Sequence, residues 1–198
     1  MLEPRLYLVD LGNVLLKLDF ERFVARAAER GTRTPDEIRA QYIHGESKSR
    51  FERGQCTADV FIEELRTFAG WPKNASTTDK LRDVWCDIFD EMEGARQAVE
   101  QLKQLGRVWV LSDTDPLHIQ WVSRNFPWAL NVNRVLTSYE HGKLKSDPGV
   151  FEAIVKEAAL PAEQILFIDD LQKNIDAAHK VSISTHLFTS WENAWLEI

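Results

Sequence analysis

Five short apolar runs are spaced along the chain, and each is bounded by polar or turn-forming residues. Continuous apolar runs of this kind are typical of strands buried on both faces of a parallel sheet. The runs cover residues 6–9, 108–111, 134–137, 165–168 and 185–188. Segments with the period of an amphipathic helix lie between them, at 93–105, 148–159 and 174–180. This alternation predicts an α/β fold, a three-layer Rossmann-like arrangement with a parallel sheet between helices.

One long segment, residues 19–92, interrupts the alternation. It contains no convincing strand, and its pattern indicates at least three helices and a fourth near its end. The expected helices cover 20–30, 35–43 after Thr34, 58–68 after Thr57, and 79–90. Threonine accepts hydrogen bonds from the first backbone amides of a helix, so both threonines fit N-cap positions. We expect a core domain of residues 1–18 and 93–198, with a small helical cap, 19–92, inserted after the first strand.

The composition adds limits on the partners of this chain. The chain is 44% hydrophobic and 28% charged, which is the balance of a globular protein. Its length of 198 residues fits one catalytic unit with an accessory element. The formal net charge is -7 and no run of Lys and Arg stands out, so nucleic acid is not an expected partner. The N-terminal residues lack the apolar length of a signal peptide or membrane span, which favours a cytoplasmic protein without a membrane partner.

Polar side chains stand where the predicted strands end. Asp10 follows the first strand, Ser112 the second, and the pair Asp169 and Asp170 the fourth, while Lys145 lies after the third. Each residue alone has a structural explanation as a cap or a surface side chain. Ligands of open α/β sheets bind outside the carboxyl ends of the strands, so these residues are expected to converge. Three carboxylates, a hydroxyl and a cation at one sheet edge indicate a functional site.

Four stretches resemble, in this order, the motifs of the haloacid dehalogenase-like (HAD) hydrolase superfamily. They are LVDLGNV at 8–14, VLSDT at 110–114, GKLKSDP at 142–148 and FIDD at 167–170. The resemblance spans nearly the whole chain, and the helical insertion stands where the family places a C1-type cap. Within the superfamily the sequence is most similar to small phosphatases of the alpha-D-glucose-1-phosphate phosphatase type, which share the Asp-x-Gly-Asn-Val motif.

The resemblance implies a nucleophile and a metal site. Asp10 would attack phosphorus and form an aspartyl-phosphate. Mg²⁺ would bind Asp10, the backbone carbonyl of Gly12 and Asp170, with Asp169 close by, because this ion prefers hard oxygen ligands.

The resemblance also assigns the groups that hold the transferring phosphoryl oxygens. These are Ser112, the backbone N–H of Asp113, and Lys145, where donors and positive charge stabilise the transition state. If Asp10 is to share a phosphate with Ser112 and a metal with Asp170, the first strand must neighbour the second and the fourth. The expected strand order is therefore 5-4-1-2-3.

Several residues depart from the family pattern. Gly12 stands where most HAD phosphatases have a second Asp that serves as general acid and base, which is typically worth about 10²- to 10⁴-fold in rate. Asp113 and Asp115 replace amides, and Ser146 replaces a proline. We interpret Asp113 as the cap of the following turn and His118 as a packing or capping residue. The cations Lys17, Lys48, Arg50 and Arg53 are interpreted as solvated side chains.

The expected function is Mg²⁺-dependent hydrolysis of a small phosphate monoester, with a sugar phosphate as one candidate substrate. Two alternatives stay open at this point. A haloacid dehalogenase is compatible with Gly12, although the adjacent acids Asp169 and Asp170 favour a metal-dependent enzyme. A catalytically weak HAD-fold protein with a binding or regulatory role is compatible with the substitutions at Gly12, Asp113 and Ser146.

Overall fold

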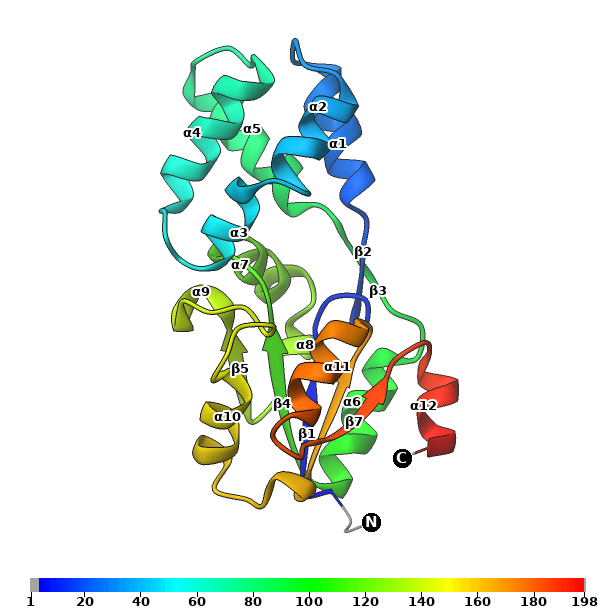
Figure 1. Cartoon of the computed structure of the whole chain (residues 1–198). Coiled ribbons are helices and arrows are strands. Elements are labelled where there is room, and N and C mark those ends of the chain that lie inside the picture. The colour runs from blue at the N-terminus through cyan, green and yellow to red at the C-terminus, as the bar shows by residue number, and fades with distance from the viewer. Residues whose placement is uncertain (1–3, 198) are drawn as a thin grey trace.

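The computed structural model describes residues 4–197, and its centre is a five-stranded parallel sheet (Figure 1). The strands are β1 (Leu6–Val9), β4 (Arg107–Ser112), β5 (Arg134–Thr137), β6 (Ile165–Asp169) and β7 (Ser184–Leu187). Their order is β5-β4-β1-β6-β7, and every neighbouring pair is parallel. The predicted order, with the first strand between the second and the fourth, is confirmed.

The two faces of the sheet are covered by different helices because side chains alternate along each strand. Tyr7 and Val9 belong to one core with α6 (Ala95–Leu105), whereas Leu6 and Leu8 belong to a second core with α10 (Val150–Ala158). The first core also includes residues of α7 (Pro116–Asn125), α8 (Pro127–Leu130) and α12 (Trp191–Glu197), and the second includes residues of α11 (Gln172–His179). The short elements α9 (Ser138–His141) and η1 (Ala162–Gln164) complete this α/β part. The three-layer prediction is confirmed.

A group of five helices lies beyond the carboxyl ends of the strands, at the top of Figure 1. They are α1 (Phe20–Glu29), α2 (Pro35–Tyr42), α3 (Glu46–Glu52), α4 (Ala58–Ala69) and α5 (Ala75–Cys86). The expected caps are present, since the hydroxyl groups of Thr34 and Thr57 accept from the backbone N–H groups of Glu37 and Val60. The expected fourth helix begins earlier than predicted because Asn74 caps it, accepting from Thr77 N at 2.9 Å.

The expectation of a strand-free segment was wrong. Strand β3 (Phe89–Glu91) pairs antiparallel with β2 (Leu16–Leu18), and this two-stranded ribbon carries the chain into and out of the helical group. The end predicted for the fourth helix, residue 90, was wrong for the same reason. Each strand has only three residues, and their pairing joins positions more than 70 residues apart in the sequence.

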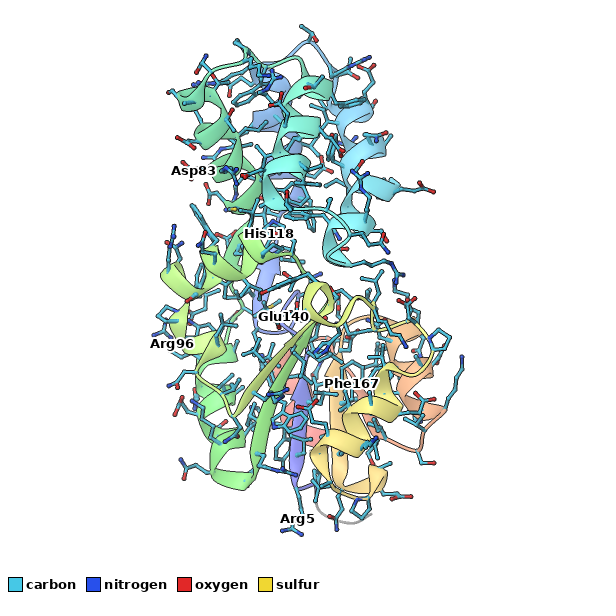
Figure 2. All side chains as sticks on the ribbon, turned by 90° about the vertical axis from the view of Figure 1, so that its left-hand side faces the viewer. Arg5, Asp83, Arg96, His118, Glu140 and Phe167 are labelled. Atoms are coloured by element: carbon cyan, nitrogen blue, oxygen red, sulfur yellow. The ribbon has the colours of Figure 1, made fainter. Side chains whose placement is uncertain are left out.

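Trp85 of α5 lies at the centre of the packing in the helical group. Its ring centroid is 4.9 Å from that of Phe23, 4.8 Å from that of Phe61 and 4.9 Å from the stacked ring of His118. His118 belongs to α7, and Figure 2 shows it at the junction of the helical group and the sheet part. The helical group is thus fixed above the strand ends through buried aromatic contacts.

Candidate active site

Asp10 immediately follows β1 and is 6% exposed. Its backbone N–H continues the ladder to the carbonyl of Ile168 at 2.9 Å, and its Oδ1 accepts from the N–H of Leu11 at 2.6 Å. The sheet and the first turn therefore fix this carboxylate, and Oδ2 is left to face the other predicted site residues.

Lys145 joins two of the predicted carboxylates. Its Nζ lies 2.7 Å from Oδ2 of Asp10 and 2.7 Å from Oδ2 of Asp169, and the side chain is 3% exposed. A buried ammonium group is costly unless it is paired, so the two carboxylates stabilise it. The structure brings this lysine, which the resemblance assigns to the phosphoryl oxygens, into direct contact with the nucleophile candidate.

Two asparagines hold the acids that follow β6. Asn174 Nδ2 donates to Oδ1 of Asp169 at 2.9 Å, and Asn13 Nδ2 donates to Oδ2 of Asp170 at 3.2 Å. Asn13 has a positive φ of 54°, a conformation that asparagine tolerates better than most residues. Its Oδ1 also accepts from the N–H of Leu18 at 3.1 Å, so one amide ties the loop after β1 to Asp170.

Asp10, Asp169 and Asp170 form a carboxylate cluster that fits a small divalent cation. Each offers one oxygen, and these oxygens lie within 4.8 Å of one another. Carboxylate oxygens are hard ligands of the kind that Mg²⁺ prefers. Burial raises the pKa of Asp10 to about 8, with Lys145 opposing the shift and Asp169 adding to it, and burial also raises the pKa of Asp170. A cation bound here would offset this accumulation of negative charge.

Asp10 and Asp170 of this cluster line a cavity of about 220 Å³ between the strand ends and the helical group. The floor includes Asp10, Ser112 and Lys145, and the roof includes Lys48 and Glu52 of α3. Ser112 is the last residue of β4 and is 4% exposed. The predicted convergence of strand ends is observed for Asp10, Ser112, Lys145, Asp169 and Asp170.

The roof carries an ion pair that the sequence did not indicate. Lys48 Nζ lies 2.5 Å from Oε1 of Glu52, and the same ammonium lies 5.3 Å from the ring centroid of Phe20. The interpretation of Lys48 as a solvated side chain was wrong, because it lines the cavity and its side chain is only 21% exposed.

The other three cations do not line this cavity. Arg50 pairs with Glu64 inside the helical group, and Lys17 is exposed on β2. Arg53 crosses from α3 to the loop after α9 and pairs with Asp147, two residues after Lys145. Asp147 in turn accepts from the N–H of Leu144 at 2.8 Å, so this loop is held from both sides.

Gly12 lies where the missing acid of the family pattern would stand. A Cβ atom at this position would come within 2.8 Å of Cδ1 of Leu18, closer than real Cβ contacts. Leu18, which also lines the cavity, therefore occupies the space of a side chain at Gly12.

The interpretation of Asp113 as a turn cap was wrong. Its Oδ1 accepts from the backbone N–H of Lys145 at 2.8 Å, and the cap of α7 is Asp115, which accepts from Leu117 N and His118 N, each at 2.9 Å. Burial raises the pKa of Asp113, with Lys145 opposing the shift. The carboxylate of Asp113 thus positions the backbone of Lys145, which lies 32 residues later in the sequence.

Asp115 and His118 form a buried pair beneath the helical group. His118 Nδ1 lies 2.9 Å from Oδ2 of Asp115, and its Nε2 lies 3.0 Å from the carbonyl oxygen of Trp85. Trp85 Nε1 donates to the same Asp115 oxygen at 3.1 Å. The expected packing and capping role of His118 agrees with these contacts, since both ring nitrogens are engaged.

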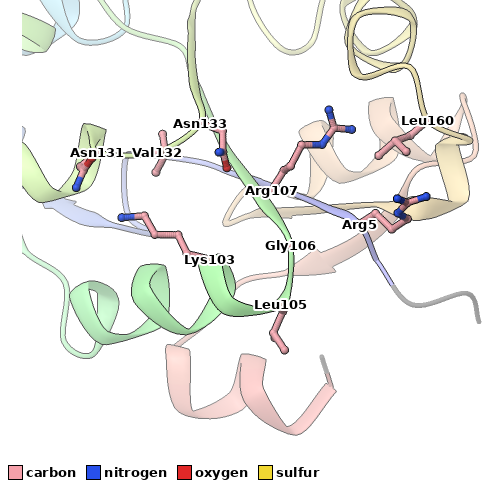
Figure 3. A pocket seen from close by; sticks show the side chains of 9 residues that line it. All are labelled: Arg5, Lys103, Leu105, Gly106, Arg107, Asn131, Val132, Asn133 and Leu160. Carbon is pink, nitrogen blue, oxygen red and sulfur yellow. The ribbon is translucent and has the colours of Figure 1, made fainter.

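A wider cavity of about 620 Å³ lies at the opposite, amino end of the strands (Figure 3). Arg5 and Arg107 flank the starts of β1 and β4 there, and Lys103 points away from them in the close-up. The lining residues that the structure describes include no carboxylate, and their cations do not converge on one point. The chemistry is therefore concentrated in the smaller cavity above Asp10.

Three residues of the site were missed by sequence reasoning. Asn13 stands within the first motif, three residues after Asp10, so its place near the site could have been predicted from the sequence. Asn174 lies five residues after Asp169, one helical turn beyond the pair. Glu52 gave no signal, because its position depends on how the helical group sits over the strands.

Comparisons with known proteins agree with this geometry. The family model for "haloacid dehalogenase-like hydrolase" matches residues 4–181. A D-ribitol-5-phosphate phosphatase from Bacteroides thetaiotaomicron is 23% identical over 183 residues, covering 89% of this chain and 87% of that protein.

Solved structures show the same fold. A HAD family enzyme from Bacteroides thetaiotaomicron, crystallised with magnesium and inorganic phosphate, superposes with a TM-score of 0.85 at 24% identity, covering 97% of this chain and 99% of that one. The L-2-haloacid dehalogenase of Xanthobacter autotrophicus superposes less closely, with a TM-score of 0.64 at 14% identity over 92% of this chain and 76% of that one. Within residues 4–197, no helix has the length and apolar character needed to cross a bilayer. With a family model that matches most of its length and with the expected residues gathered at one sheet edge, the chain belongs to the haloacid dehalogenase-like hydrolases.

Proposed function

We propose that this hydrolase is a Mg²⁺-dependent phosphatase that acts on a small phosphate monoester through an aspartyl-phosphate on Asp10. One observation carries the proposal: the Asp10 carboxylate contacts the Lys145 ammonium at 2.7 Å and forms a three-carboxylate cluster with Asp169 and Asp170. A nucleophile, a cation and a set of hard metal ligands thus meet at the floor of one cavity.

Each residue has a role that follows from phosphoryl transfer. Asp10 Oδ2 attacks phosphorus, and the bond to the leaving oxygen breaks as the aspartyl-phosphate forms. The Lys145 ammonium, the Ser112 hydroxyl and the Asp113 backbone N–H hold the phosphoryl oxygens, where charge spreads in the transition state. Water then attacks the phosphorus of the aspartyl-phosphate, which releases inorganic phosphate and restores Asp10.

The metal would be held by Asp10, Asp170 and the backbone carbonyl of Gly12. When bound, Mg²⁺ would supply positive charge that offsets the repulsion between the substrate phosphate and the carboxylate nucleophile. Asp169, already bonded to Lys145 and Asn174, keeps the lysine in place and contributes its charge to the cluster.

The small cavity and the relative support the proposed substrate class. A cavity of about 220 Å³ that is roofed by Lys48, Glu52 and Phe20 suits a compact, hydroxylated molecule. The D-ribitol-5-phosphate phosphatase of Bacteroides thetaiotaomicron supports a polyol or sugar phosphate. We propose residues 19–92 as the cap that selects this substrate and residues 1–18 and 93–198 as the catalytic core.

A panel of phosphate esters, including ribitol 5-phosphate and glucose 1-phosphate, tests the proposal in the presence of Mg²⁺ or EDTA. We expect phosphate release from at least one polyol or sugar phosphate, and loss of this activity with EDTA. A dehalogenase would instead release chloride from a 2-haloacid without metal, and a binding protein would turn over neither. Either of these results would overturn the proposal.

A further inference from the structure

The proposed reaction lacks a proton donor on the floor of the site. The leaving oxygen of an alkyl phosphate departs as an alkoxide unless it is protonated as the P–O bond breaks. Leu18 fills the space next to Gly12, because a Cβ there would approach its Cδ1 to 2.8 Å. Gly12 supplies no acid, so a side-chain proton donor has to be sought elsewhere in the cavity.

The described residues that line this cavity contribute five carboxyl or imidazole groups, and four of them are otherwise engaged. They are Asp10, Glu52, Asp113, His118 and Asp170. Asp10 is the nucleophile, and Asp170 is held by Asn13 in the carboxylate cluster. Asp113 accepts from the Lys145 backbone, and both nitrogens of His118 are bonded.

Glu52 differs from the other four groups in its contacts. It lies at the end of α3, on the roof opposite Asp10, and is 7% exposed. Oε1 accepts from Lys48 Nζ, while no residue in the described range 4–197 donates a hydrogen bond to Oε2. One carboxyl oxygen is thus anchored and the other is available to a substrate in the cavity.

The surroundings of Glu52 favour its protonated form. Burial raises the pKa of its carboxyl group above the ordinary value, and the charges of Asp115 and Asp113 add to this, although Lys48 opposes the shift. A carboxylic acid that keeps its proton closer to neutral pH is suited to general acid catalysis.

We propose that Glu52 protonates the leaving oxygen of the substrate and afterwards accepts the proton of the attacking water. In the first step Asp10 Oδ2 bonds to phosphorus, the P–O bond to the alcohol breaks, and the Glu52 proton moves to that oxygen. In the second step water attacks the aspartyl-phosphate, its proton moves to the Glu52 carboxylate, and the Asp10–phosphorus bond breaks. No redox partner or further reactant is needed.

This inference rests on the proposed function and narrows its substrate class to phosphate esters of unactivated alcohols. Such alcohols are poor leaving groups, and for them a proton donor has its largest effect. Polyol phosphates belong to this class, whereas aryl phosphates with nitro groups do not require the proton.

The test compares two leaving groups in the Glu52→Gln variant. For propyl phosphate, which has no hydroxyl groups to recognise, kcat/KM should fall by roughly 10²- to 10⁴-fold. For 2,4-dinitrophenyl phosphate, kcat/KM should change by less than about 3-fold, since this ratio reports the step that phosphorylates Asp10. The matched control is Glu46→Gln, an exposed acid on the same helix, which should behave as the parent enzyme with both substrates.

The two steps are separated by a burst experiment with 2,4-dinitrophenyl phosphate. If Glu52 also accepts the proton from water, the Glu52→Gln variant should release about one equivalent of dinitrophenol rapidly and then turn over slowly. An equal loss of kcat/KM with both substrates, or no loss with propyl phosphate, overturns the inference. If Glu52 only recognises hydroxyl groups, the loss appears with ribitol 5-phosphate but not with propyl phosphate, which also overturns it.

A second variant keeps Glu52 in place. Lys48→Met removes the cation that opposes protonation, so the alkaline limb of the kcat/KM profile for propyl phosphate should move to higher pH. The dinitrophenyl phosphate profile should keep its alkaline limb. An unmoved limb for propyl phosphate counts against Glu52 as the acid. Failure of the proposed function is distinct, because the parent enzyme itself would then show no Mg²⁺-dependent hydrolysis of either ester.

Discussion

Lys145 places its Nζ 2.7 Å from the Asp10 oxygen that faces the cavity. The contact lets a carboxylate approach an anionic phosphate, since the ammonium group offsets the repulsion between the two anions. Lys145 also contacts Asp169, so the charge of the site depends on two residues at strand ends and one in the loop after α9. Replacing any one of them changes the charge balance of the other two.

Asp10→Asn should abolish turnover while the protein stays folded. The amide is nearly isosteric with the carboxylate, but its oxygen cannot form the aspartyl-phosphate, so we expect a loss of roughly 10⁴-fold or more in kcat. Phosphate release with Mg²⁺ measures the effect, and mass spectrometry after an acid quench of the parent enzyme should detect a phosphoryl group on Asp10. In ¹⁸O water the label should enter the released phosphate and not the Asp10 carboxylate, because water attacks phosphorus. Asp176→Asn, an exposed acid on α11, is the control. A fully active Asp10→Asn enzyme would disprove the mechanism.

Asn13 should tune the metal site through Asp170. Its side chain donates to Oδ2 of Asp170 at 3.2 Å, so Asn13→Ala removes an outer partner of a ligand and should raise the half-saturating Mg²⁺ concentration by roughly 10- to 100-fold. Asp170→Asn removes the ligand charge itself and should have a larger effect. Mg²⁺ titrations of activity, with calorimetric titrations of binding, give both values. Equal Mg²⁺ dependence in all three proteins would mean that Asp170 does not bind the metal.

Without metal, Asp10→Asn should be more stable than the parent protein at alkaline pH. Burial raises the pKa of Asp10 from 3.8 to about 8, so the folded state holds a proton that the unfolded state releases. The free energy of unfolding of the parent therefore falls as pH rises from about 4 to 8, and the variant escapes this loss. Thermal melts in EDTA should show a Tm advantage of about 2–4 °C or more near pH 8.

That advantage of the Asn variant should shrink toward pH 5, because the parent carboxyl is then protonated in the folded state. Saturating Mg²⁺ should reverse the order, since the parent retains the ligand charge. A Tm difference that is independent of pH between 5 and 8 would contradict the assigned direction of the Asp10 shift.

Arg53 should affect activity more than stability. Its ion pair with Asp147 joins α3 to the loop that carries Lys145, and pairs of this exposure are worth at most about 1 kcal/mol. We expect Arg53→Gln to lower kcat/KM by about 3- to 10-fold, with a Tm change of no more than about 3 °C. Arg50→Gln breaks the pair with Glu64 within the helical group and provides the matched comparison. Equal activity of the two variants would show that the Arg53 contact does not position Lys145.

The predictable parts of the fold are those whose sequence pattern lies within one short segment. The central strands β1, β4 and β6 are continuous apolar runs because both faces of the sheet are buried there, and the polar residue that ends each run marks the active edge. Asp10, Ser112, Asp169 and Asp170 were identified from this pattern, and the four-motif resemblance supplied their roles and that of Lys145.

The parts that were missed depend on distant partners. Helix α3 has seven residues, no side-chain cap at Gly45 and few apolar positions, so its sequence resembles a charged loop. The pairing of β2 with β3, and that of Asp113 with Lys145, join segments that only the tertiary fold brings together. Lys48 and Glu52 face the cavity because α3 docks over the strand ends, which no periodicity in seven residues reveals.

Asp115 links the helical group to the sheet part of the molecule. The carboxylate is fully buried and is bonded to Trp85 of α5 and to His118 of its own helix. Severing the chain at the β2–β3 ribbon would expose the indole ring on one fragment and strip the carboxylate of a donor on the other, at a cost of about 1–3 kcal/mol for the lost bond alone. A helical group transplanted onto this sheet part would therefore leave Asp115 without its indole donor unless it also carried a tryptophan at the position of Trp85.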